Sequence, residues 1–278
     1  MDKGRIKGIA LDLDGTTLRN DGSLSDRTRS AIRKAIAQEI YVIVASGRSF
    51  GALPKEVLEL EGLFYAITSN GANGYDVRTG KRMFSHVIKE EILKELLEKL
   101  REKKATIEIF IDGIPYAQKE YVENPIKYGA TQNAVSYIQS TRTPIENMYE
   151  FAWQHGKHID SLDIIVEDES KKREFRRMAE GMRDVYVTSS VPSLVEISDV
   201  HAGKAEALKY LAGICGIRMD EMAAFGNAEN DLEMMQCVGY GVAVANAPEE
   251  ILAEVPYHTA SNQEDGVAIW LEEYFSKL

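Results

Sequence analysis

Short apolar runs alternate with helical patterns near the N-terminal end of the sequence. The stretches IKGIALDL, IYVIVASG and LFYAITSNGA, at residues 6–13, 40–47 and 63–72, are rich in β-branched residues and predict strands. Between the first two, residues 25–39 place apolar side chains at helical spacing behind Ser25, a residue type that caps helix N-termini. Strands that are apolar on both faces and are joined by helices are typical of a covered parallel sheet.

The C-terminal third repeats this alternation. It predicts a helix at 203–216, a strand at 221–227, a helix at 230–238 and a strand at 240–246. We therefore expect residues 1–82 and 185–278 to form one α/β domain around a doubly wound parallel sheet. Ligands of such sheets bind at the carboxyl ends of the strands, which is where Asp12, Ser46 and Asn227 fall.

The pattern changes between these two parts, over residues 83–184. Residues 85–104 form an amphipathic helical pattern, whereas residues 105–113 and 161–168 alternate apolar and polar positions. Alternation of this kind predicts strands with one face in water. We therefore expect an inserted α+β domain whose sheet has one solvated face.

The stretch SNGANG at residues 69–74 precedes this insert and has the composition of a tight turn. With RTGK at residues 78–81 it would carry the chain into the insert as a hairpin. Two interpretations of Asn70 and Gly71 stay open, turn chemistry and a ligand role.

Charge and cysteine content narrow the class of partner. The 278 residues include 33 Lys and Arg against 44 Asp and Glu, a formal net charge of −11. Such a surface repels nucleic acids and anionic lipid, so an anionic ligand needs a metal ion or a placed lysine. Cys215 and Cys237 predict buried thiols in a reducing compartment. Without a basic-apolar leader or a run of eighteen apolar residues, we expect a cytoplasmic protein away from membranes.

Two aspartates close the first predicted strand, at a place where stability alone gains nothing from them. The side chains of Asp12 and Asp14, two residues apart, leave a strand on the same face, and Gly15 allows a sharp turn there. Buried carboxylates need a compensating cation or hydrogen-bond donors. Such a pair can bind Mg²⁺ and divide the roles of nucleophile and general acid.

Four stretches, taken in order, resemble the four signatures of the haloacid dehalogenase superfamily of aspartate-nucleophile phosphatases. They are DLDGTTL, VIVASGRS, HAGKAEAL and FGNAENDLEMM. The insert at residues 83–184 is similar in place and size to the α/β cap of the Cof-type subfamily. The resemblance covers essentially the whole chain, and it implies a Rossmann-like core with an inserted cap that selects the substrate.

The resemblance also implies roles for individual residues. Asp12 and Asp14 would be catalytic; Ser46, Gly47, Lys204 and Asn230 would bind phosphate; Asp12, Asp14, Asn227 and Asp231 would form the Mg²⁺ site. Lys204 opens a predicted helix, where the helix dipole disfavours a cation, so a neighbouring anion would explain its position. Asn227 departs from the family, which has an aspartate there. An amide oxygen can coordinate Mg²⁺ but brings no charge, so we expect weakened metal binding.

We therefore expect a Mg²⁺-dependent phosphatase that hydrolyses small phosphorylated metabolites, sugar phosphates above all, through an aspartyl-phosphate intermediate. Two alternatives stay open: a non-enzymatic phosphoacceptor, and a phospho-ligand-binding protein in which Asn227 has silenced turnover. A monomer or a weak homo-oligomer is expected. The sequence does not identify the physiological substrate or the cap residues that select it.

Overall fold

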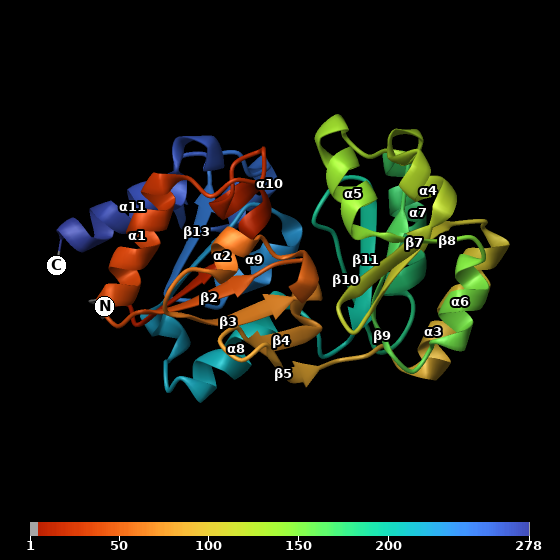
Figure 1. Cartoon of the computed structure of the whole chain (residues 1–278), viewed down its shortest axis with the longest axis horizontal. Helices are drawn as coiled ribbons and strands as arrows, with labels where there is room; N and C mark the ends of the chain where they lie inside the picture. The colour runs from red at the N-terminus through yellow and green to blue at the C-terminus, as the bar shows by residue number, and fades with distance from the viewer. Residues whose placement is uncertain (1–4, 278) are drawn as a thin grey trace. The chain divides into compact units, whose positions relative to one another are not determined.

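A computed structural model describes residues 5–277 and divides them into two compact units (Figure 1). The first, here called the core unit, comprises residues 5–48, 53–83 and 203–277. The second, the cap unit, comprises residues 49–52 and 84–202.

The core unit is built around a sheet with the strand order β14-β13-β12-β1-β2-β3-β4-β5. The pairs from β14 to β3 are parallel, and β4 runs antiparallel to β3. The predicted doubly wound α/β fold is confirmed. The strands are β1 (Gly8–Leu11), β2 (Tyr41–Ala45), β3 (Leu63–Thr68), β4 (Asn73–Asp76), β5 (Lys81–Ser85), β12 (Met222–Gly226), β13 (Tyr240–Val244) and β14 (Tyr257–Thr259).

Helices flank this sheet. Helix α1 packs against helix α11, and α8 packs against α9. Ser25 caps the first helix as predicted, because its hydroxyl accepts a hydrogen bond from the backbone N–H of Thr28 at 3.0 Å. The helices are α1 (Asp26–Ala37), α2 (Lys55–Leu58), α8 (Lys204–Ile214), α9 (Glu229–Gln236), α10 (Glu249–Glu254) and α11 (Gly266–Ser276).

The cap unit has its own sheet, with the strand order β10-β11-β9-β6-β7-β8. Its strand pairs are antiparallel except β7 with β8. The strands are β6 (Thr106–Ile111), β7 (Ile114–Gln118), β8 (Thr143–Ile145), β9 (Ile159–Ile165), β10 (Val185–Thr188) and β11 (Leu194–Asp199). The helices are α3 (Glu90–Glu102), α4 (Lys119–Glu123), α5 (Val135–Thr141), α6 (Met148–Gln154) and α7 (Glu169–Glu180).

An apolar core fills one face of the cap sheet. Leu93, Leu96, Leu97 and Leu100 of α3 pack there with side chains of α6, α7 and alternate positions of β6, β9 and β11. This cluster is separate from the buried side chains of the core unit, so each unit has a hydrophobic core of its own.

The expectation that the other face of the cap sheet is solvated was wrong. Every residue of β9 is buried, and Glu108, Asp163 and Glu196 stand side by side on β6, β9 and β11. The guanidinium of Arg142 donates two hydrogen bonds of 3.0 Å to Glu108. The polar half of the alternating pattern is buried because an arginine pairs with it, and α4 and α5 contribute a second apolar cluster there.

The predicted cap boundary at residue 184 was also wrong. The cap unit continues to Ala202, because β10 and β11 add to the edge of its sheet beside β9. Residues 185–202 therefore belong to the cap unit and not to the core unit. At the other end of the insert, the core unit ends at Met83, one residue beyond the predicted boundary.

Within residues 5–277, no helix combines the length and the apolar character needed to cross a bilayer. Cys215 and Cys237 are both free thiols, but each is half-buried, so the prediction that they are buried was wrong.

Candidate active site

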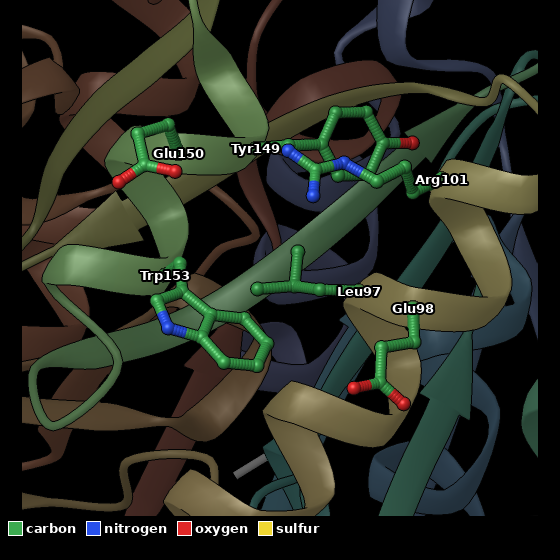
Figure 2. Close-up of a pocket in the computed structure, with 6 residues that line it drawn as sticks. All are labelled: Leu97, Glu98, Arg101, Tyr149, Glu150 and Trp153. Atoms are coloured by element: carbon green, nitrogen blue, oxygen red, sulfur yellow. The ribbon is translucent and has the colours of Figure 1, made fainter.

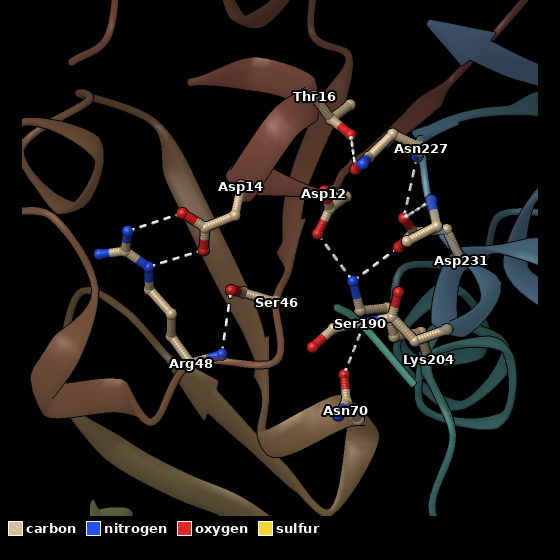
Figure 3. A network of polar contacts seen from close by, with 12 residues as sticks. Asp12, Asp14, Thr16, Ser46, Arg48, Asn70, Ser190, Lys204, Asn227 and Asp231 are labelled. Atoms are coloured by element: carbon tan, nitrogen blue, oxygen red, sulfur yellow. Dashed lines mark hydrogen bonds and ion pairs between the residues drawn. The ribbon is translucent and has the colours of Figure 1, made fainter. Parts of the chain in front are cut away.

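The candidate site lies where three neighbouring parallel strands of the core unit end (Figure 3). Asp12 follows β1, Ser46 follows β2 and Asn227 follows β12. Strand β1 pairs in parallel with both β2 and β12, so the three carboxyl ends share one edge of the sheet. The polar residues predicted at this edge are therefore brought together by the topology alone.

A buried lysine bridges two buried aspartates at this edge. The ammonium of Lys204, at the start of α8, donates to Asp12 Oδ1 at 2.7 Å and to Asp231 Oδ1 at 2.6 Å. The three side chains are 0%, 7% and 1% exposed. A lysine is rarely buried unless it is paired. The geometry thus places the predicted nucleophile, 192 residues away in the sequence, against the predicted phosphate-binding cation.

The charges of this triad do not cancel. Burial and the neighbouring Asp231 raise the pKa of Asp12 to about 7, although Lys204 acts in the opposite direction. Burial lowers the pKa of Lys204, but Asp12 and Asp231 outweigh it and leave that pKa above its ordinary value. The lysine is therefore charged at neutral pH, whereas Asp12 is only partly ionised there although both aspartates accept hydrogen bonds from that one cation. A further positive charge would favour the ionised form of Asp12.

Asp231 has both carboxylate oxygens engaged within the protein. Besides Lys204, it accepts hydrogen bonds from the backbone N–H groups of Asn227 and Ala228, at 3.0 and 3.1 Å. It therefore fixes the loop before α9 and the position of the lysine. These contacts describe a residue that supports the site, and they do not favour its predicted place among the direct metal ligands.

Asn227 faces the turn that follows Asp12. Its side-chain oxygen accepts a hydrogen bond from the hydroxyl of Thr16 at 2.9 Å. Gly15 has a φ of +76°, and a Cβ there would come within 2.9 Å of Asn227 Nδ2. Thr16 was not among the predicted site residues. The one sequence feature that could have indicated it is its position directly after Asp14 and Gly15.

The donors near Asp12 fit a hard divalent cation. The Asp12 carboxylate, the backbone carbonyl of Asp14 and the Asn227 amide are all oxygen donors, the type that Mg²⁺ prefers. Within residues 5–277, His, Cys, Asp and Glu side chains form no metal-binding group of three or more. A cation at this place would favour the ionised form of Asp12, and its site would depend on neutral oxygens as well as one carboxylate.

Asp14 points away from the triad toward Arg48. The guanidinium of Arg48 donates from Nε to Asp14 Oδ2 and from Nη2 to Oδ1, each at 2.7 Å (Figure 3). Arg48 also donates its backbone N–H to the hydroxyl of Ser46 at 3.1 Å. Arg48, which directly follows Ser46 and Gly47, thus forms an ion pair with Asp14.

Ser46, Gly47 and Asn230 surround Asn70. Ser46 is buried, and its carbonyl accepts a hydrogen bond from the Asn70 N–H at 3.2 Å. The Asn230 amide donates to Asn70 Oδ1 at 2.9 Å, and Gly47 lies against the same side chain. The Asn70 carbonyl accepts from the N–H of Gly203 at 2.9 Å. Asn70 thus connects three loops of the site, a role beyond turn formation that its sequence context left open.

The cap unit has a pocket between α3 and α6 (Figure 2). Cations of the chain itself cover its aromatic rings, since Arg101 lies 5.8 Å from the Tyr149 ring and Lys94 lies 5.4 Å from the Trp153 ring. None of the predicted site residues lines it. Its lining consists of Leu97, Glu98, Arg101, Tyr149, Glu150 and Trp153.

Comparison with known proteins identifies the family of the chain. The family profile of haloacid dehalogenase-like hydrolases matches residues 9–271. The chain is 28% identical to the 5-amino-6-(5-phospho-D-ribitylamino)uracil phosphatase YwtE of Bacillus subtilis, covering 98% of this chain and 99% of that protein. It is 29% identical to the phosphatase YwpJ of the same organism, over 95% of this chain and 98% of the other.

Solved structures show the same fold. A haloacid dehalogenase-like hydrolase from Bacillus subtilis superposes with a TM-score of 0.84 at 26% identity, over 96% of this chain and 99% of the other. The sequence profile, the relatives and the fold all indicate the same family. The chain therefore belongs to the haloacid dehalogenase-like hydrolase family.

Proposed function

We propose that this protein is a Mg²⁺-dependent phosphomonoester hydrolase that forms an aspartyl-phosphate intermediate on Asp12. The observation that carries the proposal is the buried contact of Asp12 with Lys204, residues that would act together as nucleophile and phosphate-binding cation. Asp14, two residues away, supplies the acid–base group.

In the first half-reaction, a carboxylate oxygen of Asp12 attacks phosphorus in line with the ester oxygen. The bond between phosphorus and the ester oxygen breaks, and its electron pair leaves with that oxygen. The carboxyl group of Asp14 gives up its proton to the departing oxygen, so that an alcohol leaves. Lys204 and the hydroxyl of Ser46 are placed to stabilise the charge on the phosphoryl oxygens.

In the second half-reaction, a water molecule attacks phosphorus of the aspartyl phosphate. The Asp14 carboxylate, left unprotonated by the first step, accepts a proton from that water. The bond between Asp12 and phosphorus breaks, which regenerates the Asp12 carboxylate and releases inorganic phosphate. Asp231 keeps Lys204 in place through both steps by its 2.6 Å contact.

The metal would be held by the Asp12 carboxylate, the backbone carbonyl of Asp14 and the amide oxygen of Asn227. When bound, Mg²⁺ supplies positive charge that neutralises the charge developing on the phosphoryl oxygens. Thr16 orients the amide of Asn227 for this purpose by donating to its oxygen.

The substrate class is proposed to be small phosphorylated metabolites, with sugar and sugar-alcohol phosphates first. Support comes from the relative YwtE, a phosphatase named for a substrate with a phosphate on a ribityl chain. The leaving groups of such esters are strongly basic alkoxides, which need a proton as they depart. A site with a general acid can supply it. Location in the cytoplasm and a monomeric or weakly associated state stay predictions.

The test is turnover of p-nitrophenyl phosphate with and without Mg²⁺, followed by a panel of sugar phosphates. Sustained, Mg²⁺-dependent release of phosphate, lost in Asp12→Asn, is the expected result. One stoichiometric burst of p-nitrophenolate would instead identify a phosphoacceptor. Saturable phosphate binding without any turnover would identify a ligand-binding protein, and either result would contradict the proposal.

A further inference from the structure

Arg48 is a charged group at the candidate site to which the proposed reaction has assigned no role. It follows Ser46 and Gly47 at the end of β2, and its two parallel hydrogen bonds engage both oxygens of the Asp14 carboxylate (Figure 3). Two donors on one planar group fix the plane and the rotation of a carboxylate, which a single ammonium cannot do. The pair therefore fixes the orientation of the Asp14 carboxylate and also neutralises its charge.

Arg48 is the anchored partner of this pair. Its side chain is 16% exposed, whereas the Asp14 side chain is 56% exposed. Its backbone is fixed at both ends, because its N–H donates to Ser46 Oγ at 3.1 Å and its carbonyl accepts from Ser69 N–H at 3.0 Å. The more exposed Asp14 carboxylate is thus held by a guanidinium whose backbone is fixed beside Ser46.

Stability does not account for this arrangement, because ion pairs with a largely exposed partner contribute little to folding. The proposed reaction does account for it. Asp14 must present one oxygen to the departing ester oxygen, and a freely rotating aspartate would do so only part of the time. In the structure both oxygens accept from Arg48, so one of them has to turn to the ester oxygen while the other keeps its hydrogen bond.

We propose that Arg48 is a positioning residue for Asp14, whose guanidinium holds the acid–base carboxylate in line with the leaving oxygen of the substrate. The inference rests on the proposed function. It assigns Arg48 to the leaving-group side of the reaction and not to the transferred phosphoryl group, which Lys204 and Ser46 would contact.

The test compares two leaving groups. p-Nitrophenolate is a weak base and departs without a proton, whereas the alkoxide of an alkyl phosphate needs one. Glycerol 3-phosphate, ribitol 5-phosphate and glucose 6-phosphate are screened, and the ester hydrolysed fastest is paired with p-nitrophenyl phosphate. Both are assayed with the full-length wild type and with Arg48→Lys, which keeps the charge but loses the two-donor geometry.

We expect Arg48→Lys to lower kcat/KM for the alkyl ester about tenfold or more, a fraction of what a general acid contributes, and kcat/KM for the aryl ester about twofold at most. The ratio kcat/KM is the measure because it reports only the steps up to departure of the alcohol, and not the second half-reaction, which both esters share. The inhibition constant of inorganic phosphate should change little. An equal loss on both esters, or weaker inhibition by phosphate, would mean that Arg48 contacts the phosphoryl group, and would overturn the inference.

A double-mutant cycle adds a second readout. Asp14→Asn should itself be selective against the alkyl ester, and adding Arg48→Lys to it should cause no further selective loss. Arg29→Lys is the matched control, because Arg29 also pairs with a carboxylate, Glu56, at 2.8 Å in the same unit. A selective loss in the Arg29 variant as well would point to a general effect on folding and overturn the inference.

The design separates this inference from the proposed function. A wild type that hydrolyses no ester with Mg²⁺ would overturn both. A wild type with turnover that depends on Asp12, combined with unselective Arg48 variants, would overturn only the role of Arg48.

Discussion

Asn227 shows how one side chain changes the electrostatics of a site while keeping its geometry. Its amide oxygen occupies a place where an aspartate would add a negative charge, and Thr16 donates to that oxygen. A hydroxyl can donate to a carboxylate equally well, so the hydrogen bond does not require asparagine. The charge, and not the shape, is therefore what an aspartate would change here.

We predict that Asn227→Asp raises the affinity for Mg²⁺ about tenfold or more. Two unit charges about 4 Å apart interact by roughly 4 kcal/mol at an effective dielectric near 20, and desolvation offsets much of this. Tenfold corresponds to about 1.4 kcal/mol. Mg²⁺ titration of activity and calorimetric titration both measure the change. Asn133→Asp, which adds the same charge at an exposed position, is the control; equal Mg²⁺ dependence in all three proteins would contradict the prediction.

A second residue-level prediction concerns the buried acids of the cap unit. Burial, then the neighbouring Glu196 and Glu108, raise the pKa of Asp163 well above its ordinary value, and Arg142 only partly opposes this. A group with a raised pKa favours folding most at low pH. Its contribution declines as pH rises from the ordinary pKa of an aspartate toward the raised pKa in the folded protein.

Asp163→Asn should therefore leave stability nearly unchanged at pH 4 and raise it progressively as the pH increases. At pH 9 we expect a melting temperature about 2–4 °C higher than that of the wild type, which corresponds to about 1 kcal/mol in a chain of this size. Thermal unfolding measured from pH 4 to pH 9 provides the check. A stabilisation that shrinks with rising pH would show that Asp163 is ionised in the folded protein.

At the scale of elements, the tight turn between β3 and β4 positions the start of α8. Gly71 has a φ of +94°, and a Cβ there would overlap the backbone oxygen of Gly203, the residue before Lys204. The close approach of these two backbones sets where the lysine enters the site. The Asn70 carbonyl, which accepts from Gly203 N–H, reinforces the same contact.

Gly71→Ala should destabilise the protein by about 1–3 kcal/mol, because an alanine would be strained at this φ and would displace the Gly203 backbone. Phosphatase activity should fall by a larger factor than the fraction of folded protein, since Lys204 moves with Gly203. Gly213→Ala in α8 is the matched control: nothing lies within 4 Å of its Cβ, and helix propensity favours alanine. Chemical denaturation and phosphatase assays of both variants test this. Full activity in a folded Gly71 variant would refute the link to Lys204.

At the scale of the whole molecule, local patterns predicted the core unit better than the cap unit. Its strands are apolar on both faces, and parallel topology then brings Asp12, Ser46 and Asn227 to one edge without further information. The polar face of the cap sheet could not be assigned in this way. Its burial depends on Arg142, which lies 34 residues from Glu108, and an alternating strand looks the same whether water or an arginine covers it. The contact of Arg48 with Asp14 is non-local in the same sense.

The two units each have their own sheet and their own apolar core, so we predict that they unfold separately. The sequence contains two tryptophans, and one lies in each unit: Trp153 in α6 of the cap unit and Trp270 in α11 of the core unit. The variants Trp270→Phe and Trp153→Phe each retain one tryptophan, so that its fluorescence reports on a single unit.

Leu96→Ala, placed in both single-tryptophan proteins, distinguishes separate from joint unfolding. Leu96 is 0% exposed in the cap core, and removing such a side chain costs about 2–5 kcal/mol. The urea midpoint reported by Trp153 should fall by about 1 M or more, and that reported by Trp270 should stay where it was. Ile43→Ala, equally buried in β2, should have the opposite pattern. If either substitution moves both midpoints by the same amount, the units unfold together, and their separate cores do not act as separate cooperative units.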